Sequence, residues 1–227
     1  MSTFFIVSTP IGNLEDVTLR ALRVLREVDV VVCEDTRVTG KLLAHLEIKK
    51  QLLSYNAHAT EARHEQVIEM LREGKKVALV SDAGTPAISD PGSMLVSEVR
   101  KALGDEAKIE IIPGPSAVTA ALALTGFPSS DFLFLGFLPH KKGRETLFAE
   151  ISGSDRTVIF YESPHRIMKT LESLALKLDP ARKIAICREL TKIYEECRVG
   201  SAPDILDHYL KNPDTVRGEF VVVVSAR

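Results

Sequence analysis

The 227-residue sequence lacks the features that mark several specialised classes of protein. No run approaches the ~20 apolar residues of a membrane-spanning helix, so we expect no membrane span. The first ten residues, MSTFFIVSTP, have no basic segment and only a short apolar run, which argues against a signal peptide. Lysine and arginine number 29 against 31 aspartates and glutamates, so no global positive field favours a nucleic acid, although a local basic patch stays open. These absences predict a cytoplasmic protein.

Cysteine and the common cofactor motifs are scarce as well. The three cysteines, Cys33, Cys187 and Cys197, form neither a CxxC pair nor an even disulfide set, and we interpret them as buried, reduced thiols. No histidine and cysteine spacing is typical of a metal centre, so no metal site is predicted. Neither GxGxxG nor GxxxxGK[ST] occurs, which argues against a dinucleotide-binding Rossmann site and a P-loop.

In the first half of the chain, strand-like apolar runs alternate with segments of helical periodicity. The strand-like runs are 4–8, 30–33, 52–53, 77–80 and 109–112, and the helical segments are 16–27, one ending near 46, one ending at 74, 95–103 and 115–125. This alternation predicts βαβ units and a mostly parallel sheet.

The pattern changes after Gly126. Strand-like runs then occur at 132–138, 157–161, 183–187, 193–198 and 220–224, with a helix expected over 167–178. Because two of these runs follow each other without a helix between them, we expect a mixed or antiparallel sheet. The fold class is therefore predicted as two α/β domains, residues 1–127 with the parallel sheet and 128–227 with the mixed one.

The most informative segment is Ser81–Gly92, SDAGTPAISDPG, which follows the apolar run VALV. It is longer and more polar than the roughly four to six residues of a median connection. Its glycines allow close backbone approach to a ligand and its prolines restrict the chain. In open α/β sheets, ligands bind beyond the carboxyl ends of the strands, and this loop is therefore predicted to line a ligand site.

Three further loops follow predicted strands of the first domain. Ser8–Asn13 is either a ligand loop or an ordinary turn with a helix cap. Glu34–Arg37, EDTR, is either a site with two acids or a helix start whose acids are stabilised by the helix dipole. Pro113–Ser116 enters a helix, where exposed N–H groups suit an anion. In the second domain, Tyr161–Arg166 and Arg188–Lys192 also place charged side chains directly after strands.

Taken together in order, six segments resemble the tetrapyrrole-methylase superfamily of S-adenosylmethionine enzymes. They read STPIGNLEDVTLRAL, VCEDTR, ALVSDAGTPAISDPG, IIPGPSA, FYESPHR and RELTK, and span nearly the whole chain. More narrowly they are similar to its small-subunit rRNA branch, which methylates the ribose 2′-hydroxyl of a cytidine in the decoding region of 16S rRNA. The corrin branch carries GxGPGD where this chain has Ser8–Asn13, and Gly-Gly-Asp-Pro where it has Ala83–Pro86.

The resemblance implies S-adenosylmethionine as cofactor, bound in a cleft between the two domains, and a homodimer. The superfamily's cofactor contacts correspond to the following residues: Pro10, Gly84, Thr85, Ile88, Ser116, Ala117, Glu162 and Gly200. The implied partner is 16S rRNA of the small ribosomal subunit.

The implied reaction needs a group that accepts the hydroxyl proton, and Asp35, Glu34 and Asp82 are the candidates. Arg37 and Lys192 are candidates to hold phosphate. The basic cluster of Lys141, Lys142 and Arg144 is either an RNA-binding patch or a solvated linker. Two other functions stay open at this point: methylation of a small tetrapyrrole-like molecule, and cofactor or ribosome binding without catalysis.

Overall fold

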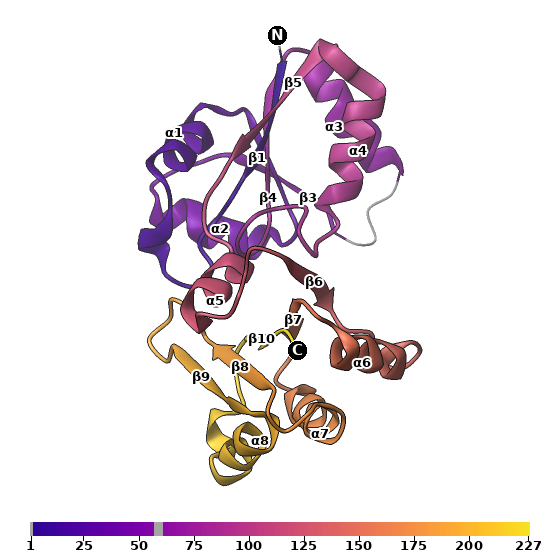
Figure 1. Ribbon diagram of the computed structural model, residues 1–227. Coiled ribbons are helices and arrows are strands. Elements are labelled where there is room, and N and C mark those ends of the chain that lie inside the picture. Colours follow the sequence, from indigo (N-terminus) through magenta and orange to yellow (C-terminus); the bar gives the residue numbers. More distant parts are fainter. Residues whose placement is uncertain (1, 57–60) are drawn as a thin grey trace. The chain divides into compact units, whose positions relative to one another are not determined.

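The strands of this protein form two separate five-stranded sheets (Figure 1). The structure, a computed structural model, describes residues 2–56 and 61–227. It divides the chain into two units, Met1–Ser116 and Ala117–Arg227, with one sheet in each. This confirms the predicted fold class. The division falls earlier than the predicted residue 127, because the helix that starts at Ala117 packs on strands of the second sheet.

The sheet of the first unit is parallel throughout and has the order β3-β2-β4-β1-β5. Its strands are β1 Ser2–Val7, β2 Val30–Cys33, β3 Gln51–Ser54, β4 Lys76–Val80 and β5 Ala107–Ile112. β1 and β4 lie side by side, with Phe4 opposite Val77 and Ile6 opposite Leu79. Both faces are apolar, as expected for a parallel sheet covered on each side by helices.

Two pairs of helices cover the two faces of this sheet. They are α1 Leu19–Glu27 and α2 Thr36–His45 on one face, and α3 Glu61–Arg72 and α4 Gly92–Leu103 on the other (Figure 1). A hydrophobic core lies on each face of the sheet, and alternate residues of a strand pack into opposite cores. Phe4 packs with α3 and α4, whereas Phe5 packs with α1 and α2. Thr18 begins α1 by accepting a hydrogen bond from the Ala21 backbone N–H.

The strand order creates a topological switch point between β1 and β4. From β1 the chain passes through α1 to β2, and from β4 it passes through α4, on the opposite face, to β5. The loops after β1 and β4 therefore start next to each other and diverge to opposite faces. In open α/β sheets the crevice at such a point is where ligands bind.

The sheet of the second unit is mixed, as predicted, and has the order β6-β7-β10-β8-β9. Its strands are β6 Phe132–Phe137, β7 Thr157–Glu162, β8 Lys183–Arg188, β9 Glu196–Ser201 and β10 Phe220–Val224. β6 and β7 are parallel, whereas the other neighbouring pairs are antiparallel. Helices α6 Arg144–Gly153, α7 Ile167–Lys177 and α8 Ala202–Lys211 pack on one face, and α5 Ala117–Thr125 packs against β9 and β10.

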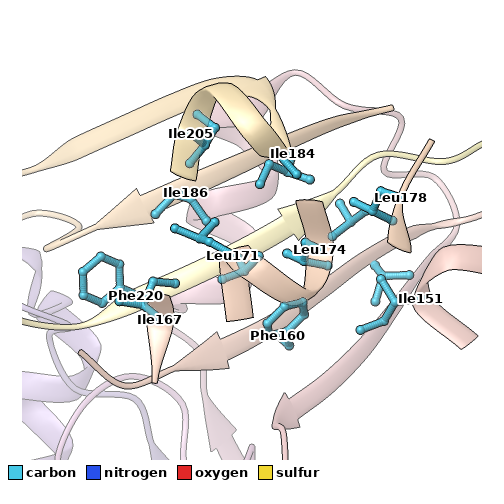
Figure 2. Close-up of a cluster of buried hydrophobic side chains, with 14 of the residues drawn as sticks. Ile151, Phe160, Ile167, Leu171, Leu174, Leu178, Ile184, Ile186, Ile205 and Phe220 are labelled. Atoms are coloured by element: carbon cyan, nitrogen blue, oxygen red, sulfur yellow. The ribbon is translucent and has the colours of Figure 1, made fainter. Parts of the chain in front are cut away.

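The core of the second unit lies between its sheet and the helices α6, α7 and α8. Figure 2 shows Phe160, Ile184 and Ile186 of the strands facing Leu171 and Leu174 of α7. Three short 3-10 helices, Leu14–Asp16, Gly104–Glu106 and Pro213–Thr215, complete the described secondary structure. Among the described helices, none combines the length and apolarity that a bilayer span requires.

Three sequence-based expectations were incomplete or wrong in detail. The strand expected over 193–198 begins only at Glu196, because the residues before it form a turn in which Glu189 and Thr191 have φ values of 52° and 65°. Ile193, taken as a strand residue, is 95% exposed at this turn. Helices α6 and α8 were not predicted. Likewise α5 begins at Ala117 rather than at Pro115.

We expect Arg182 to be a main polar support of the second unit. Its buried guanidinium donates to the carbonyls of Ser225, Ile151, Ser152 and Ser154 at 2.7, 2.8, 2.9 and 3.1 Å. Arg182→Met removes the donor that these carbonyls share, although the Ile151 carbonyl keeps the Ser154 N–H at 3.3 Å, and should lower the free energy of unfolding by about 2–4 kcal/mol in urea titrations. Arg156→Met is the control, because this exposed residue makes only a 3.6 Å ion pair, worth under ~1 kcal/mol. Equal decreases in both variants would contradict this role.

Candidate functional site

The loops after β1 and β4 are joined directly by backbone hydrogen bonds. The Thr9 N–H donates to the Gly84 carbonyl at 2.9 Å, and the Gly84 N–H donates to the Thr9 carbonyl at 3.1 Å. The Thr9 hydroxyl also donates to the Ser81 carbonyl at 3.2 Å. Both Ser8 and Thr9 are buried, so these polar contacts are largely removed from water. The two loops at the switch point are therefore held together by hydrogen bonds that water does not compete for.

The loop after β5 is connected to the loops after β1 and β4 through Ser8 and Thr85. The three joined loops are called the loop layer below. The Ser8 N–H donates to the Ile112 carbonyl at 3.1 Å, and the Ser8 and Thr85 hydroxyls lie 3.0 Å apart. The Thr85 hydroxyl donates in turn to the Pro115 carbonyl at 3.3 Å. Three of the four predicted loops thus meet at the carboxyl edge of the sheet, as the strand order requires.

Glycine is needed at two points of this layer. Gly84 has a φ of +81°, and an added Cβ would lie 3.2 Å from Ile11 Cγ2. At Gly114 an added Cβ would lie 2.9 Å from the Ser8 Cβ. Pro10 and Ile11 are both buried, and Ile11 lies beside Gly84. At Gly84 and Gly114 the backbone lies so close to neighbouring residues that a Cβ atom would crowd them.

The outer part of the Ser81–Gly92 loop is strained. Ala87 and Ser89 have φ values of 69° and 64°, and between them Ile88 is 47% exposed. The Asp90 carboxylate stabilises this shape, since its Oδ1 accepts from the N–H groups of Ala87 at 3.0 Å and Gly92 at 2.7 Å. Such conformations cost about 1–3 kcal/mol each and cluster at ligand sites. Ile88 is thus exposed on a loop whose shape Asp90 holds.

The acids of the Glu34–Arg37 segment stand beside this layer, next to Asp82. The Asp35 N–H donates to Asp82 Oδ1 at 3.1 Å, which connects the ends of β2 and β4. The Asp35 carboxylate caps α2 by accepting from the Arg37 N–H at 2.8 Å. It also forms an ion pair with the Arg37 guanidinium at 2.6 Å, and the Arg37 side chain is 86% exposed.

The three acids differ in their protonation behaviour. Hydrogen bonds from Arg37 lower the pKa of Asp35 to about 2. Burial, followed by the nearby charges of Asp35 and Asp90, raises the pKa of Asp82, although the Asp35 N–H opposes this. Burial and the charges of Asp82, Asp90 and Asp35 raise the pKa of Glu34. Asp82 and Glu34 are therefore the stronger bases of this cluster, and Asp35 is the weakest.

In the second unit, Glu162 has a structural role that the sequence did not reveal. Its fully buried carboxylate pairs with Arg144 at 3.1 Å and Arg166 at 2.8 Å, and accepts from the Thr170 hydroxyl at 2.7 Å. The Arg144 guanidinium also lies 5.1 Å from the Phe148 ring centre. Glu162 and Arg144, both predicted site residues, thus hold each other inside the second unit.

The other predicted residues of the second unit are more scattered. Lys192 pairs with Glu189 and Glu219, each at 2.8 Å, within the turn before β9. Gly200 lies on β9, where an added Cβ would be 3.3 Å from Ile205 of α8 and would crowd that side chain. Lys141 and Lys142 are exposed just before α6, and Ala117 begins α5 directly after Ser116. The acid cluster lies beside the joined loops after β1, β4 and β5, whereas these residues of the second unit do not join one cluster.

Two residues of this layer were missed in the sequence. Ser8 and Asp90 stood inside recognised loops, but only the tertiary contacts show that Ser8 bridges two loops and Asp90 holds the strained one. Within residues 2–56 and 61–227, no group of three or more His, Cys, Asp or Glu side chains is placed to hold a metal ion.

The sequence matches the family described as Tetrapyrrole (Corrin/Porphyrin) Methylases over residues 3–206. A Thermotoga maritima protein named ribosomal RNA small subunit methyltransferase I is 45% identical over 227 residues, which cover 100% of both chains. A Halalkalibacterium halodurans protein of the same name is 46% identical over 225 residues, covering 98% of this chain and 75% of that protein.

Solved structures show the same fold at lower identity. The uroporphyrin-III-C-methyltransferase of Thermus thermophilus has a TM-score of 0.66 and 23% identity, covering 98% of this chain and 94% of its own. The methyltransferase CobJ has a TM-score of 0.68 and 23% identity, covering 100% and 95%. At this identity the likeness concerns the fold alone.

The raised pKa of Asp82 predicts a pH-dependent stability effect. Because its folded-state pKa exceeds its unfolded value, the folded protein is favoured below the ordinary carboxyl pKa and loses stability as pH rises through the raised pKa. Asp82→Asn should therefore raise Tm at neutral pH, and the gain should vanish in acid. Asp35→Asn is the opposite control, since its lowered pKa means that neutralising it should lower Tm at neutral pH. Shifts of the same sign in both variants would refute the assignment.

Proposed function

The chain belongs to the tetrapyrrole methylase family, and from that premise we propose that it methylates small-subunit ribosomal RNA. The reaction transfers a methyl group from S-adenosylmethionine to the 2′-hydroxyl of a cytidine ribose in the decoding region of 16S rRNA. One observation carries the proposal: relatives named ribosomal RNA small subunit methyltransferase I are 42–46% identical along 97–100% of this chain. Solved structures whose names refer to uroporphyrin or precorrin are only 18–23% identical.

The joined loops of the first unit suit S-adenosylmethionine, which when bound supplies a methyl group on a positively charged sulfonium. Gly84 leaves backbone open where a Cβ would crowd Ile11, and Thr85 is fixed by Ser8 and Pro115. Ile88 is presented on the strained loop as an apolar contact. With Pro10, Ser116 and Ala117, these residues are the proposed cofactor-binding set of the first unit and its boundary.

Asp82 is the proposed acceptor of the ribose hydroxyl proton. Its Oδ1 is occupied by the Asp35 N–H, so Oδ2 is the atom that would take the proton. Glu34, whose pKa is raised by burial and by the same acids, is the second candidate. Asp35 is poorly suited because Arg37 holds its pKa at about 2, and we assign it to positioning Arg37.

Orientation of the hydroxyl is expected to matter more than its deprotonation. A sulfonium methyl is already activated, and alignment supplies up to roughly 7–11 kcal/mol, whereas a general base adds about 10²–10⁴-fold. The Arg37 guanidinium is 86% exposed while tied to Asp35, which suits it to an RNA phosphate near the acid cluster.

RNA binding is proposed to involve Lys141 and Lys142, which are exposed in the loop before α6. Arg144 is left out of this surface because Glu162 and Thr170 already hold its guanidinium. Lys192 joins only if RNA competes with Glu189 and Glu219 for its ammonium group. Contacts of the cofactor with Gly200 and Glu162, the homodimer and the cytoplasmic location stay predictions.

The proposal is tested with small ribosomal subunits from cells that lack this protein. Purified protein and labelled S-adenosylmethionine should restore one ribose methylation in 16S rRNA, located by nuclease mapping and mass spectrometry. Turnover of a porphyrin-like substrate without RNA methylation would select the small-molecule alternative. Binding of cofactor or subunits without transfer would select the non-catalytic one.

For the proton acceptor, we expect Asp82→Asn to lower turnover by about 10²–10⁴-fold, with cofactor affinity unchanged in calorimetry. The amide keeps Oδ1 as acceptor for the Asp35 N–H, so the fold should persist. Asp35→Asn is the matched comparison. It should lower turnover less than Asp82→Asn does, and its main effect should be a higher KM for RNA. A larger drop in turnover for Asp35→Asn than for Asp82→Asn would reverse the assignment.

For RNA affinity, we expect the double change Lys141→Glu and Lys142→Glu to weaken binding without altering cofactor affinity. The binding constant for RNA should also depend less on salt. For each contact between a lysine and a phosphate that is lost, the slope of log K against log salt concentration should become less negative by about 0.7–0.9. The control reverses Lys169 and Lys183, two lysines elsewhere in the second unit. If both double variants bind RNA like the parent protein, the loop before α6 is only a solvated linker.

A further inference from the structure

Two of the three cysteines face each other across neighbouring strands. Cys187 of β8 and Cys197 of β9 are direct partners in the antiparallel register, and their sulfur atoms lie 3.2 Å apart. Both are free thiols in the structure. Their separation of ten residues in the chain gives no recognisable motif, so the sequence alone suggested unrelated buried thiols.

The backbone at this pair has the geometry that a disulfide requires. Directly opposed residues of antiparallel strands have Cα atoms about 4.5–5.5 Å apart, which lies within the roughly 4.4–6.8 Å that disulfides span. The sulfur atoms need to approach from 3.2 Å to about 2.0 Å, a change that small side-chain rotations provide. No change of strand register is needed.

The two thiols differ in their access to reagents. Cys187 is fully buried on β8, whereas Cys197 is partly exposed on β9, the edge strand (Figure 1). The hydrogen bond between the two thiols lowers the pKa of Cys197, against the opposing effects of burial and of Glu195 and Glu196. The same bond and burial raise the pKa of Cys187. Cys197 is thus the thiol suited to attack, and Cys187 the one suited to resolve.

We propose that Cys187 and Cys197 form a redox-active pair that a low-molecular-weight disulfide, such as oxidised glutathione, converts reversibly to an intramolecular disulfide. The Cys197 thiolate attacks one sulfur of the oxidant, forms a mixed disulfide and releases one glutathione thiolate, which takes up a proton. Cys187 then loses its proton and attacks the Cys197 sulfur, releasing the second glutathione as a thiol. Overall, two cysteine thiols are oxidised while one glutathione disulfide is reduced to two thiols.

The consequence is a covalent clamp at the edge of the second sheet. The bond closes the segment between β8 and β9, whose turn is already held by Lys192 between Glu189 and Glu219. Edge strand β9 is then fixed on β8, which restricts opening of the sheet edge. The clamp does not depend on the proposed methyl transfer, because neither thiol belongs to the acid cluster or the cofactor loops.

The test exposes the reduced full-length protein to graded ratios of oxidised and reduced glutathione. Differential alkylation and peptide mass mapping should find a Cys187–Cys197 disulfide, with a mass decrease of about 2 Da, that reduced glutathione reverses. Cys33, fully buried on β2, is the internal control and should stay a free thiol. The oxidised form should also show a Tm several degrees higher than the reduced form.

Single variants separate the two roles. Cys187→Ser should accumulate the mixed disulfide at Cys197, which the parent protein passes through without accumulating. Cys197→Ser should leave Cys187 unmodified, because the buried thiol is not reached first. The proposal is overturned if the parent protein keeps both thiols free in excess oxidised glutathione. It is equally overturned if the parent stops at the mixed disulfide, or if Cys33 oxidises as readily.

Discussion

The backbone bridge between Thr9 and Gly84 is the interaction on which the candidate site depends. It joins the loops after β1 and β4 at the point where the chain leaves the sheet toward opposite faces. Without it, the polar loop Ser81–Gly92 would be a long connection free to adopt many conformations, at a large cost in entropy on ligand binding. Ser8 and Thr85 extend the bridge to the loop after β5, so that three strand ends act as one preorganised surface.

Electrostatics at the same edge divides three similar acids into different roles. Asp35 stays ionised, pairs with Arg37 and caps α2. These contacts stabilise the fold but make the Asp35 carboxylate a weak base. For Asp82 and Glu34, burial and the charges of neighbouring acids instead raise the pKa of each carboxyl group. A cluster of like charges is unfavourable for stability, and retaining it beside a strained loop is typical of a functional site rather than of a structural one.

The second unit shows how the same residue types serve structure instead. Glu162 and Arg144 end a strand and begin a helix, as site residues often do, yet their ion pair is buried with Arg166 and Thr170. Such a buried charge is tolerated because each oxygen has a partner. The thiols of Cys187 and Cys197 come together for a different reason, since strand register rather than sequence spacing makes them neighbours.

The sequence by itself determined the two α/β units, most strand positions, the polar loops that follow the strands and, through the order of its motifs, the family. These features are readable because apolar periodicity and turn residues act locally. Only the tertiary structure decided which polar residues meet: Asp35 with Asp82, Ser8 with Thr85, Glu162 with Arg144 and Cys187 with Cys197. Those pairs depend on the order and register of the strands, which bring residues that are distant in the chain next to each other. Local sequence patterns do not determine that order or register.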